Sequence, residues 1–121
     1  MSRVRVPLAG LIAVTFALTG CASAVVEPVA VSAGRIVIDV RSPGEYAEGH
    51  LDGARLLDLT GGEFAAATPA LDPAAGYLVY CRSGNRSAQA ARLLTDAGFR
   101  DVTDLGSLEE ASAATGLPVV R

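Results

Sequence analysis

The amino-acid sequence predicts a single α/β domain with a central, mostly parallel sheet and helices on both faces. The chain has 121 residues, which is enough for one domain of ordinary size but not for two. Short β-branched or apolar runs alternate along the chain with helical patterns. Such alternation is typical of a parallel sheet that is buried on both faces.

The strands are expected over residues 36–40, 54–59, 77–80 and 101–105. The first is a β-branched run that starts at Ile36 and lies between Gly34 and a Ser-Pro-Gly sequence, as buried strands often do. The run from Tyr77 to Tyr80 is the strongest strand signal, and it leads directly into Cys81.

A short helix is expected after the first strand. Ser42 is a good capping residue, Pro43 suits the first helical position, and Glu45 stands three residues after the cap. The helix must be short because Gly49 follows.

Three further helices are expected. Residues 62–67 suggest a brief helix that ends at Pro69, and residues 107–113 suggest a second short helix. Residues 117–120 form the tail of the chain. The clearest helical pattern covers residues 87–97 and stops at Gly98. Its expected buried face consists of Ala90, Leu93, Leu94 and Ala97.

The N-terminus has the pattern of a secretory leader. Arg3 and Arg5 precede an uncharged apolar run over residues 7–18, which is shorter than the roughly twenty residues that a membrane span needs. The run continues into Leu18-Thr19-Gly20-Cys21, which resembles the bacterial lipobox, where the cysteine is acylated before cleavage. The alternatives are a signal peptide that a cysteine happens to follow, or an uncleaved anchor.

On this interpretation residues 1–20 are a lipoprotein signal peptide, residues 21–33 a tether, and residues 34–121 the folded domain. Acyl chains on Cys21 would anchor the protein to a bacterial membrane outside the cytoplasm without a transmembrane helix. The chain has ten basic and thirteen acidic residues, and loss of Arg3 and Arg5 would make it more acidic still. We therefore expect no nucleic-acid partner.

Cys81 is the candidate nucleophile. It is the only thiol left if Cys21 is acylated, and it stands where a buried strand ends and a helix soon begins, the usual place for a ligand site in a parallel sheet. The loop Arg82-Ser83-Gly84-Asn85-Arg86 can turn its amides inward, and the following helix N-terminus adds positive potential. We expect the Cys81 thiol to ionise more readily than a free thiol, whose pKa is about 8.5. The alternative is an inert buried cysteine beside an ordinary turn.

The segment from Tyr80 to Ser87 resembles the active-site loop of the rhodanese family, and the upstream segments 38–41, 45–46 and 49–54 are similar to that family's signature. The resemblance extends from about Arg35 to the end of the chain and implies a single rhodanese-like domain. It implies that the Cys81 thiolate takes sulfur from thiosulfate or a similar donor, holds it as a persulfide, and passes it to cyanide or a thiol. No cofactor and no metal are implied.

The resemblance also assigns roles around the cysteine. Arg82 to Arg86 would bind the substrate, with both arginines attracting an anionic donor, and Asp39 and Arg41 would support the loop. His50 is the only histidine, and we expect a structural role rather than general-base catalysis. Four residues separate Cys81 from Arg86, whereas protein tyrosine phosphatases have five, so the smaller ring favours sulfur over phosphate.

The chain departs from the family pattern at two places. Only the thin tether precedes the first strand, and the closing segment reads Gly106-Ser107-Leu108 in a chain without tryptophan. These departures concern the sheet edge and the pocket rim.

Two other functions stay open: a carrier or sensor that holds a persulfide with little turnover, and a thiol-disulfide partner protein.

Overall fold

The computed structural model describes residues 28–31 and 34–121. Its main sheet has four parallel strands in the order β3-β1-β4-β5. The strands are β1 (Arg35–Asp39), β3 (Arg55–Leu56), β4 (Gly76–Cys81) and β5 (Asp101–Ser107). The predicted α/β class with a mostly parallel sheet is confirmed.

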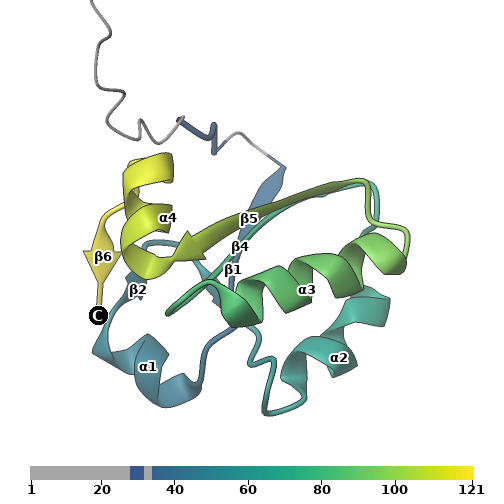
Figure 1. Ribbon diagram of the computed structural model, residues 1–121, viewed down its shortest axis with the longest axis horizontal. Helices are drawn as coiled ribbons and strands as arrows, with labels where there is room; N and C mark the ends of the chain where they lie inside the picture. Colours follow the sequence, from purple (N-terminus) through teal and green to yellow (C-terminus); the bar gives the residue numbers. More distant parts are fainter. Residues whose placement is uncertain (1–27, 32–33) are drawn as a thin grey trace, which may run out of the picture.

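Helices lie on both faces of this sheet, as expected (Figure 1). One face is covered by α2 (Glu63–Ala67), which continues as the 3-10 helix η1 (Thr68–Ala70), and by α3 (Asn85–Asp96). The other is covered by α4 (Leu108–Thr115) with α1 (Pro43–Glu48) and a two-stranded antiparallel sheet. That small sheet consists of β2 (His50–Leu51) and β6 (Val119–Val120).

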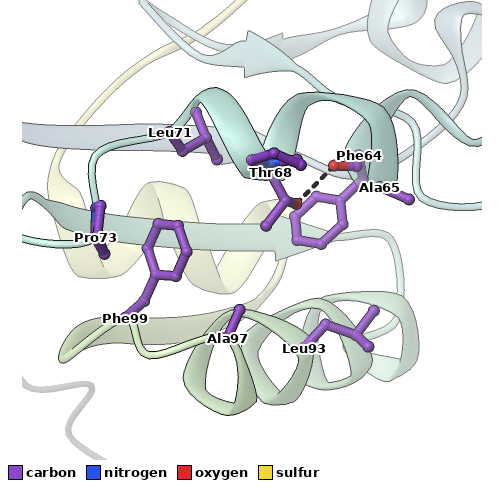
Figure 2. A pocket seen from close by; sticks show the side chains of 9 residues that line it. Phe64, Ala65, Thr68, Leu71, Pro73, Leu93, Ala97 and Phe99 are labelled. Atoms are coloured by element: carbon purple, nitrogen blue, oxygen red, sulfur yellow. Dashed lines mark hydrogen bonds between the residues drawn. The ribbon is translucent and has the colours of Figure 1, made fainter.

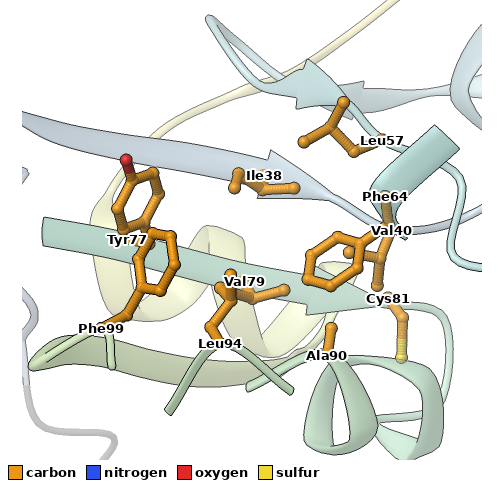
Figure 3. Close-up of a cluster of buried hydrophobic side chains, with 10 residues drawn as sticks. All are labelled: Ile38, Val40, Leu57, Phe64, Tyr77, Val79, Cys81, Ala90, Leu94 and Phe99. Atoms are coloured by element: carbon orange, nitrogen blue, oxygen red, sulfur yellow. The ribbon is translucent and has the colours of Figure 1, made fainter. Parts of the chain in front are cut away.

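Strand β4 is central and divides the core into two clusters. All six of its residues are buried, and successive side chains point to opposite faces. Tyr77, Val79 and Cys81 join the cluster under α2 and α3 (Figure 3), while Leu78 and Tyr80 join the one under α4. The nucleophile candidate is therefore the last residue of the best-buried strand.

Two helices begin with a complete capping box. The Ser42 hydroxyl accepts from the Glu45 amide at the start of α1, and the Glu45 carboxylate accepts from the Ser42 amide in return. Ser107 and Glu110 repeat this arrangement at the start of α4. The predicted cap at Ser42 is confirmed.

Several predicted boundaries were wrong. The strand expected over residues 54–59 shrinks to two residues because only Arg55 and Leu56 pair with β1. The helix expected over residues 62–67 is present as α2, but a 3-10 turn continues through Pro69, since the fixed φ of proline also suits that turn. The helix predicted from Ser107 starts at Leu108, because Ser107 serves as its cap, and it runs on to Thr115.

The predicted apolar face of α3 was also partly wrong. Ala90 and Leu94 are buried, but Leu93 is 44% exposed and Ala97 is exposed as well. The third buried residue is Ser87, so the inward face is Ser87, Ala90 and Leu94 at helical spacing.

The leader, Cys21 and most of the expected tether lie outside the described residues. Val29, within the segment expected to be a tether, donates its backbone amide to the Ala114 carbonyl (2.8 Å) and packs against the α4 cluster. None of the helices in residues 28–31 and 34–121 has the length and apolar character to span a bilayer.

Candidate functional site around Cys81

Cys81 lies at the carboxyl end of β4 and is completely buried, with 0% exposure. Its side chain points towards the first turn of α3 (Figure 3). The turn between strand and helix is shorter than expected, because α3 begins at Asn85 rather than at Ser87. Only Arg82, Ser83 and Gly84 separate the two elements.

Gly84 makes this tight turn possible. It is the N-cap of α3 and has a φ of 94°, which residues with a Cβ rarely adopt. In this conformation its amide points at the sulfur and donates a hydrogen bond to Cys81 Sγ at 2.9 Å. No side-chain hydrogen bond caps α3; the sulfur instead accepts from the amide of the N-cap residue itself.

Ser87 is a site residue that the sequence-based assignment of roles left out. It is fully buried, and its Oγ lies 3.4 Å from Cys81 Sγ. The Ser87 hydroxyl donates to the Gly84 carbonyl at 3.1 Å, with the Gly106 carbonyl at 3.5 Å. When Cys81 is a thiolate, rotation of this hydroxyl lets it donate to sulfur instead. The sequence signal for it is a hydroxyl residue on the inward face of the first turn of a helix, six residues after a cysteine that ends a strand.

The electrostatics favour the anionic form of Cys81. Burial by itself raises the pKa of this thiol, but hydrogen bonds from the Ser87 hydroxyl and from the amides of Ser87, Gly84 and Ser83 outweigh burial and lower the pKa below its ordinary value. The inward-facing amides expected from the loop are therefore present. A larger fraction of Cys81 is thiolate at neutral pH than in a free cysteine.

Removal of the Ser87 hydroxyl is expected to reduce this fraction. In Ser87→Ala the thiolate loses one donor, so the pH profile of Cys81 alkylation should move to higher pH and the rate at neutral pH should fall several-fold. Ser87→Thr, which keeps the hydroxyl, is the matched control. An alanine profile identical to that of the wild type would contradict the assignment.

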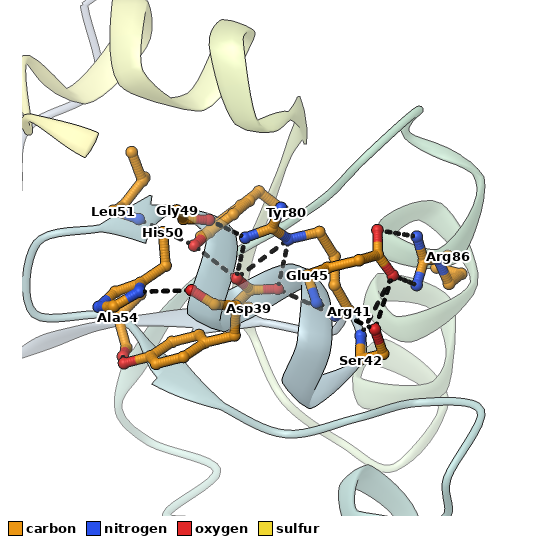
Figure 4. Close-up of polar contacts among 11 residues, drawn as sticks. Asp39, Arg41, Ser42, Glu45, Gly49, His50, Leu51, Ala54, Tyr80 and Arg86 are labelled. Atoms are coloured by element: carbon orange, nitrogen blue, oxygen red, sulfur yellow. Dashed lines mark hydrogen bonds and ion pairs between the residues drawn. The ribbon is translucent and has the colours of Figure 1, made fainter. Parts of the chain in front are cut away.

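The two loop arginines have different surroundings. Arg86 makes a two-pronged ion pair with Glu45 of α1, with distances of 2.8 Å and 3.0 Å from its Nη atoms to the carboxylate oxygens (Figure 4). Hydrogen bonds from Arg86, against an opposing effect of burial, lower the pKa of Glu45 from about 4.5 to about 2. The stabilisation by this pair is thus complete above about pH 4.5 and is lost as the pH falls through about 2. Arg82 is exposed.

Asp39 and Arg41 form a buried ion pair at the end of β1, the strand that pairs with the cysteine strand β4 (Figure 4). Arg41 Nη2 lies 2.7 Å from Asp39 Oδ2 and also donates to the Gly49 carbonyl at 2.6 Å. Tyr80, the residue before Cys81, donates its hydroxyl to Asp39 Oδ2 at 2.7 Å and accepts from the Leu51 amide at 3.0 Å. This network fixes the end of β4 to β1, β2 and the end of α1.

His50 contacts α1 instead of the cysteine loop. Its Nδ1 lies 2.8 Å from the Tyr46 carbonyl, and its ring stacks on the Tyr46 ring with centroids 3.6 Å apart. Among the residues that the structure describes, it makes no hydrogen bond to Cys81 or to the loop. In the same part of the chain, no three His, Cys, Asp or Glu side chains gather in a way that would hold a metal ion.

The cysteine at the strand end, the glycine turn and the buried ion pair all lie between Asp39 and Ser87. The model of the rhodanese-like domain matches residues 27–114, which include all of these features. The chain belongs to the rhodanese-like domain family.

Named relatives agree with this membership. The chain is 42% identical over 69 residues to the thiosulfate sulfurtransferase GlpE of Pseudomonas putida, a match that covers 57% of this chain and 61% of that protein. It is 34% identical over 73 residues to the thiosulfate sulfurtransferase PspE of Escherichia coli, covering 60% of this chain and 70% of that one. The chain thus spans about three fifths of the length of the first of these relatives.

Solved structures share the fold. A structure described as rhodanese with anions from E. coli has a TM-score of 0.60 and 31% identity, and the match covers 72% of this chain and 98% of that chain. A structure of the Alr3790 protein from Anabaena has a TM-score of 0.63 and 29% identity, covering 74% and 79% respectively.

The rhodanese-like domain has two hollows of interest. A polar hollow of about 300 Å³ lies beside the cysteine loop and is lined by Arg41, Glu45, Glu48, Gly49, Arg82, Leu108, Glu109 and Val119. An apolar groove of about 430 Å³ lies between α2 with η1 and the far half of α3, with Phe64, Leu93 and Phe99 among its lining residues (Figure 2). Only the polar hollow includes a residue of the cysteine loop.

Proposed function

We propose that this chain is a rhodanese-type sulfurtransferase that moves sulfane sulfur from thiosulfate or a similar donor to cyanide or a thiol through a persulfide on Cys81. The observation that carries the proposal is the geometry at the sulfur. A single buried thiol receives a 2.9 Å hydrogen bond from the Gly84 amide, lies beside the Ser87 hydroxyl, and has a lowered pKa. These are the requirements for a thiolate nucleophile.

The reaction needs no general base when Cys81 reacts as the thiolate, the form that the loop hydrogen bonds favour. The Cys81 thiolate attacks the outer sulfur of thiosulfate, a sulfur–sulfur bond to Cys81 forms, and the bond within thiosulfate breaks with its electron pair leaving on sulfite. The terminal sulfur of the persulfide is then anionic and takes over the amide hydrogen bonds of the loop. Cyanide or a thiolate attacks this outer sulfur, and Cys81 leaves as the thiolate.

Two further facts support sulfur chemistry. Relatives at 42% and 34% identity carry the name thiosulfate sulfurtransferase. Four residues lie between Cys81 and Arg86 in the loop, and the Arg86 guanidinium is paired with Glu45 rather than left available to bind a phosphate group. Both facts argue against phosphatase activity.

Intact-mass measurement after exposure to thiosulfate tests the proposal. The wild type should gain the mass of one sulfur atom, lose it on addition of cyanide, and yield thiocyanate in repeated turnovers. Cys81→Ser should do none of these, while Cys21→Ser, which keeps the site, should behave like the wild type. Absence of any sulfur adduct on the wild type would refute sulfur transfer.

A persulfide carrier is the second candidate, and the complete burial of Cys81 favours it. Burial protects a persulfide from solvent but also slows the approach of an acceptor. The same experiment separates the two functions, because a carrier would take up sulfur and release it to cyanide in a single slow step without sustained turnover.

We also propose that the protein is anchored outside the cytoplasm of a bacterium by acyl chains on Cys21, through a leader over residues 1–20 and a tether over residues 21–33. The support is the sequence pattern of basic head, apolar run and Leu-Thr-Gly-Cys. Mass spectrometry of the protein extracted from membranes should find acylated Cys21 at the N-terminus. An unmodified Cys21 behind an intact leader would contradict the anchor.

A further inference from the structure

We propose that Glu45 sets the charge of the donor-binding site, and that this site prefers sulfur donors of low negative charge, such as a thiosulfonate monoanion, over the thiosulfate dianion. The inference rests on the proposed function and makes Glu45 a specificity-determining residue. For a thiosulfonate the chemistry is balanced in the same way as for thiosulfate: the Cys81 thiolate attacks the outer sulfur, and a sulfinate leaves with the electron pair.

Arg86 is already paired in the structure. Its guanidinium is held by both carboxylate oxygens of Glu45, a geometry that satisfies the arginine and neutralises its charge. The two side chains are 28% and 23% exposed, so the pair is partly shielded from solvent. Glu45 is itself fixed at the start of α1 by Ser42, and the two partners are therefore held in place from both helices.

Among its described residues, the polar hollow has more unpaired acidic than unpaired basic side chains. Arg41 is already paired with Asp39, and Glu45 with Arg86. Among the residues of this hollow, that leaves Arg82 as a cation, with Glu48 and Glu109 as acids, all three exposed and without an ion pair in the described part of the chain.

These charges decide between donors. Arg82 is next to Cys81 in the chain and offers one positive charge to an incoming anion. The carboxylates of Glu48 and Glu109, in the same hollow, repel that anion. A second negative charge on the donor meets no further free cation there, because Arg86 is neutralised. A donor with one negative charge or none avoids most of this repulsion.

The substitution Glu45→Gln tests the inference with little disturbance of structure. Glutamine at the third helical position can still complete a capping box with Ser42, so α1 should keep its start. The change removes only the charge that neutralises Arg86. Asp96→Asn, which changes the net charge equally at the far end of α3, is the matched control.

The primary measurement does not need sulfur transfer. The full-length protein is alkylated at Cys81 with iodoacetate, an anion, or iodoacetamide, which is neutral and similar in size, and the two rates are compared by peptide mass spectrometry. Both reagents react with the same thiolate at the same buried position, so the thiolate fraction and the accessibility of the sulfur cancel in the ratio of the two rates. In Glu45→Gln we expect the ratio of the iodoacetate rate to the iodoacetamide rate to rise about fivefold at low salt and to fall back at high salt. About fivefold is the rate factor for two opposite unit charges roughly 4 Å apart in water.

Two comparisons complete the test. Asp96→Asn should leave the ratio unchanged, and Glu45→Gln combined with Arg86→Gln should return it to the wild-type value, because both charges are then absent. With sulfur donors, Glu45→Gln should raise kcat/KM for thiosulfate relative to benzenethiosulfonate by a similar factor. A ratio that stays at the wild-type value in Glu45→Gln would overturn the inference even if sulfur transfer is normal, whereas a protein without sulfur transfer that shows the fivefold change would refute only the proposed function.

Discussion

Asp39→Asn is expected to destabilise the fold by roughly 3–5 kcal/mol, the usual cost of removing one partner of a buried ion pair. The Arg41 side chain is only 6% exposed, so its charge would remain buried with the Gly49 carbonyl as its main partner. Tyr80 would lose the carboxylate that accepts its hydroxyl hydrogen bond. Urea denaturation should show a lower midpoint with an unchanged slope.

The surface ion pair between Arg35 and Asp101 supplies the control. Its side chains are 30% and 47% exposed, and the distance from Arg35 Nη2 to Asp101 Oδ2 is 3.6 Å. Asp101→Asn should therefore cost less than about 1 kcal/mol. Adding Arg41→Met to Asp39→Asn should recover part of the lost stability, because the stranded charge is then gone. Equal costs for the two asparagine variants would show that the buried network does not hold the site.

Gly84→Ala should lower the reactivity of Cys81 at neutral pH about tenfold or more. A Cβ at a φ of 94° is strained even though the nearest atom, the Gly106 Cα, lies at an ordinary contact distance of 3.7 Å. Relief of this strain rotates the Gly84 amide away from Cys81 Sγ, and a hydrogen bond to a charged group contributes about 1.5–3 kcal/mol. The pH profile of alkylation should move to higher pH.

Gly98→Ala is the control for strain alone. Gly98 follows the other end of α3, has a φ of 97°, and has no atom within 4 Å of an added Cβ. Both alanine variants should lose a similar 1–2 kcal/mol of stability, but only Gly84→Ala should change the behaviour of the thiol. The amide would have no role if the two variants left the Cys81 profile equally unaffected.

The sequence predicts the main sheet well because its strands are marked by local composition. The apolar run over Tyr77–Tyr80 and the Ser42 capping box each depend on neighbouring residues, and both are found where expected. The strand around Ala54 was predicted too long, because an apolar run does not reveal how many of its residues find a partner strand. The start of α3 was placed too late because Gly84 caps the helix through its backbone conformation rather than with a side chain.

The place of Cys81 in the fold was predictable from the sequence, but the charge around it was not. The position of Cys81 at a strand end followed from the order of elements along the chain. The pair between Glu45 and Arg86 joins residues 41 positions apart, and the network of Tyr80 with Asp39 spans the same separation. No local pattern reports such contacts, so both arginines of the loop were expected to face the substrate. Only the fold shows that one of them is already paired.

Loop amides and the Ser87 hydroxyl lower the pKa of the Cys81 thiol, so that more of it is thiolate at neutral pH than in a free cysteine. The most direct test of this is the ultraviolet absorbance of the thiolate followed against pH in the wild type, with Cys81→Ser subtracted to remove the contributions of tyrosines and of Cys21. This measurement needs no reagent to reach the buried sulfur. We expect the pKa of Cys81 to lie below that of a free cysteine measured under the same conditions. A pKa equal to or above that of the free cysteine would contradict this, since burial would then outweigh the hydrogen bonds of the loop.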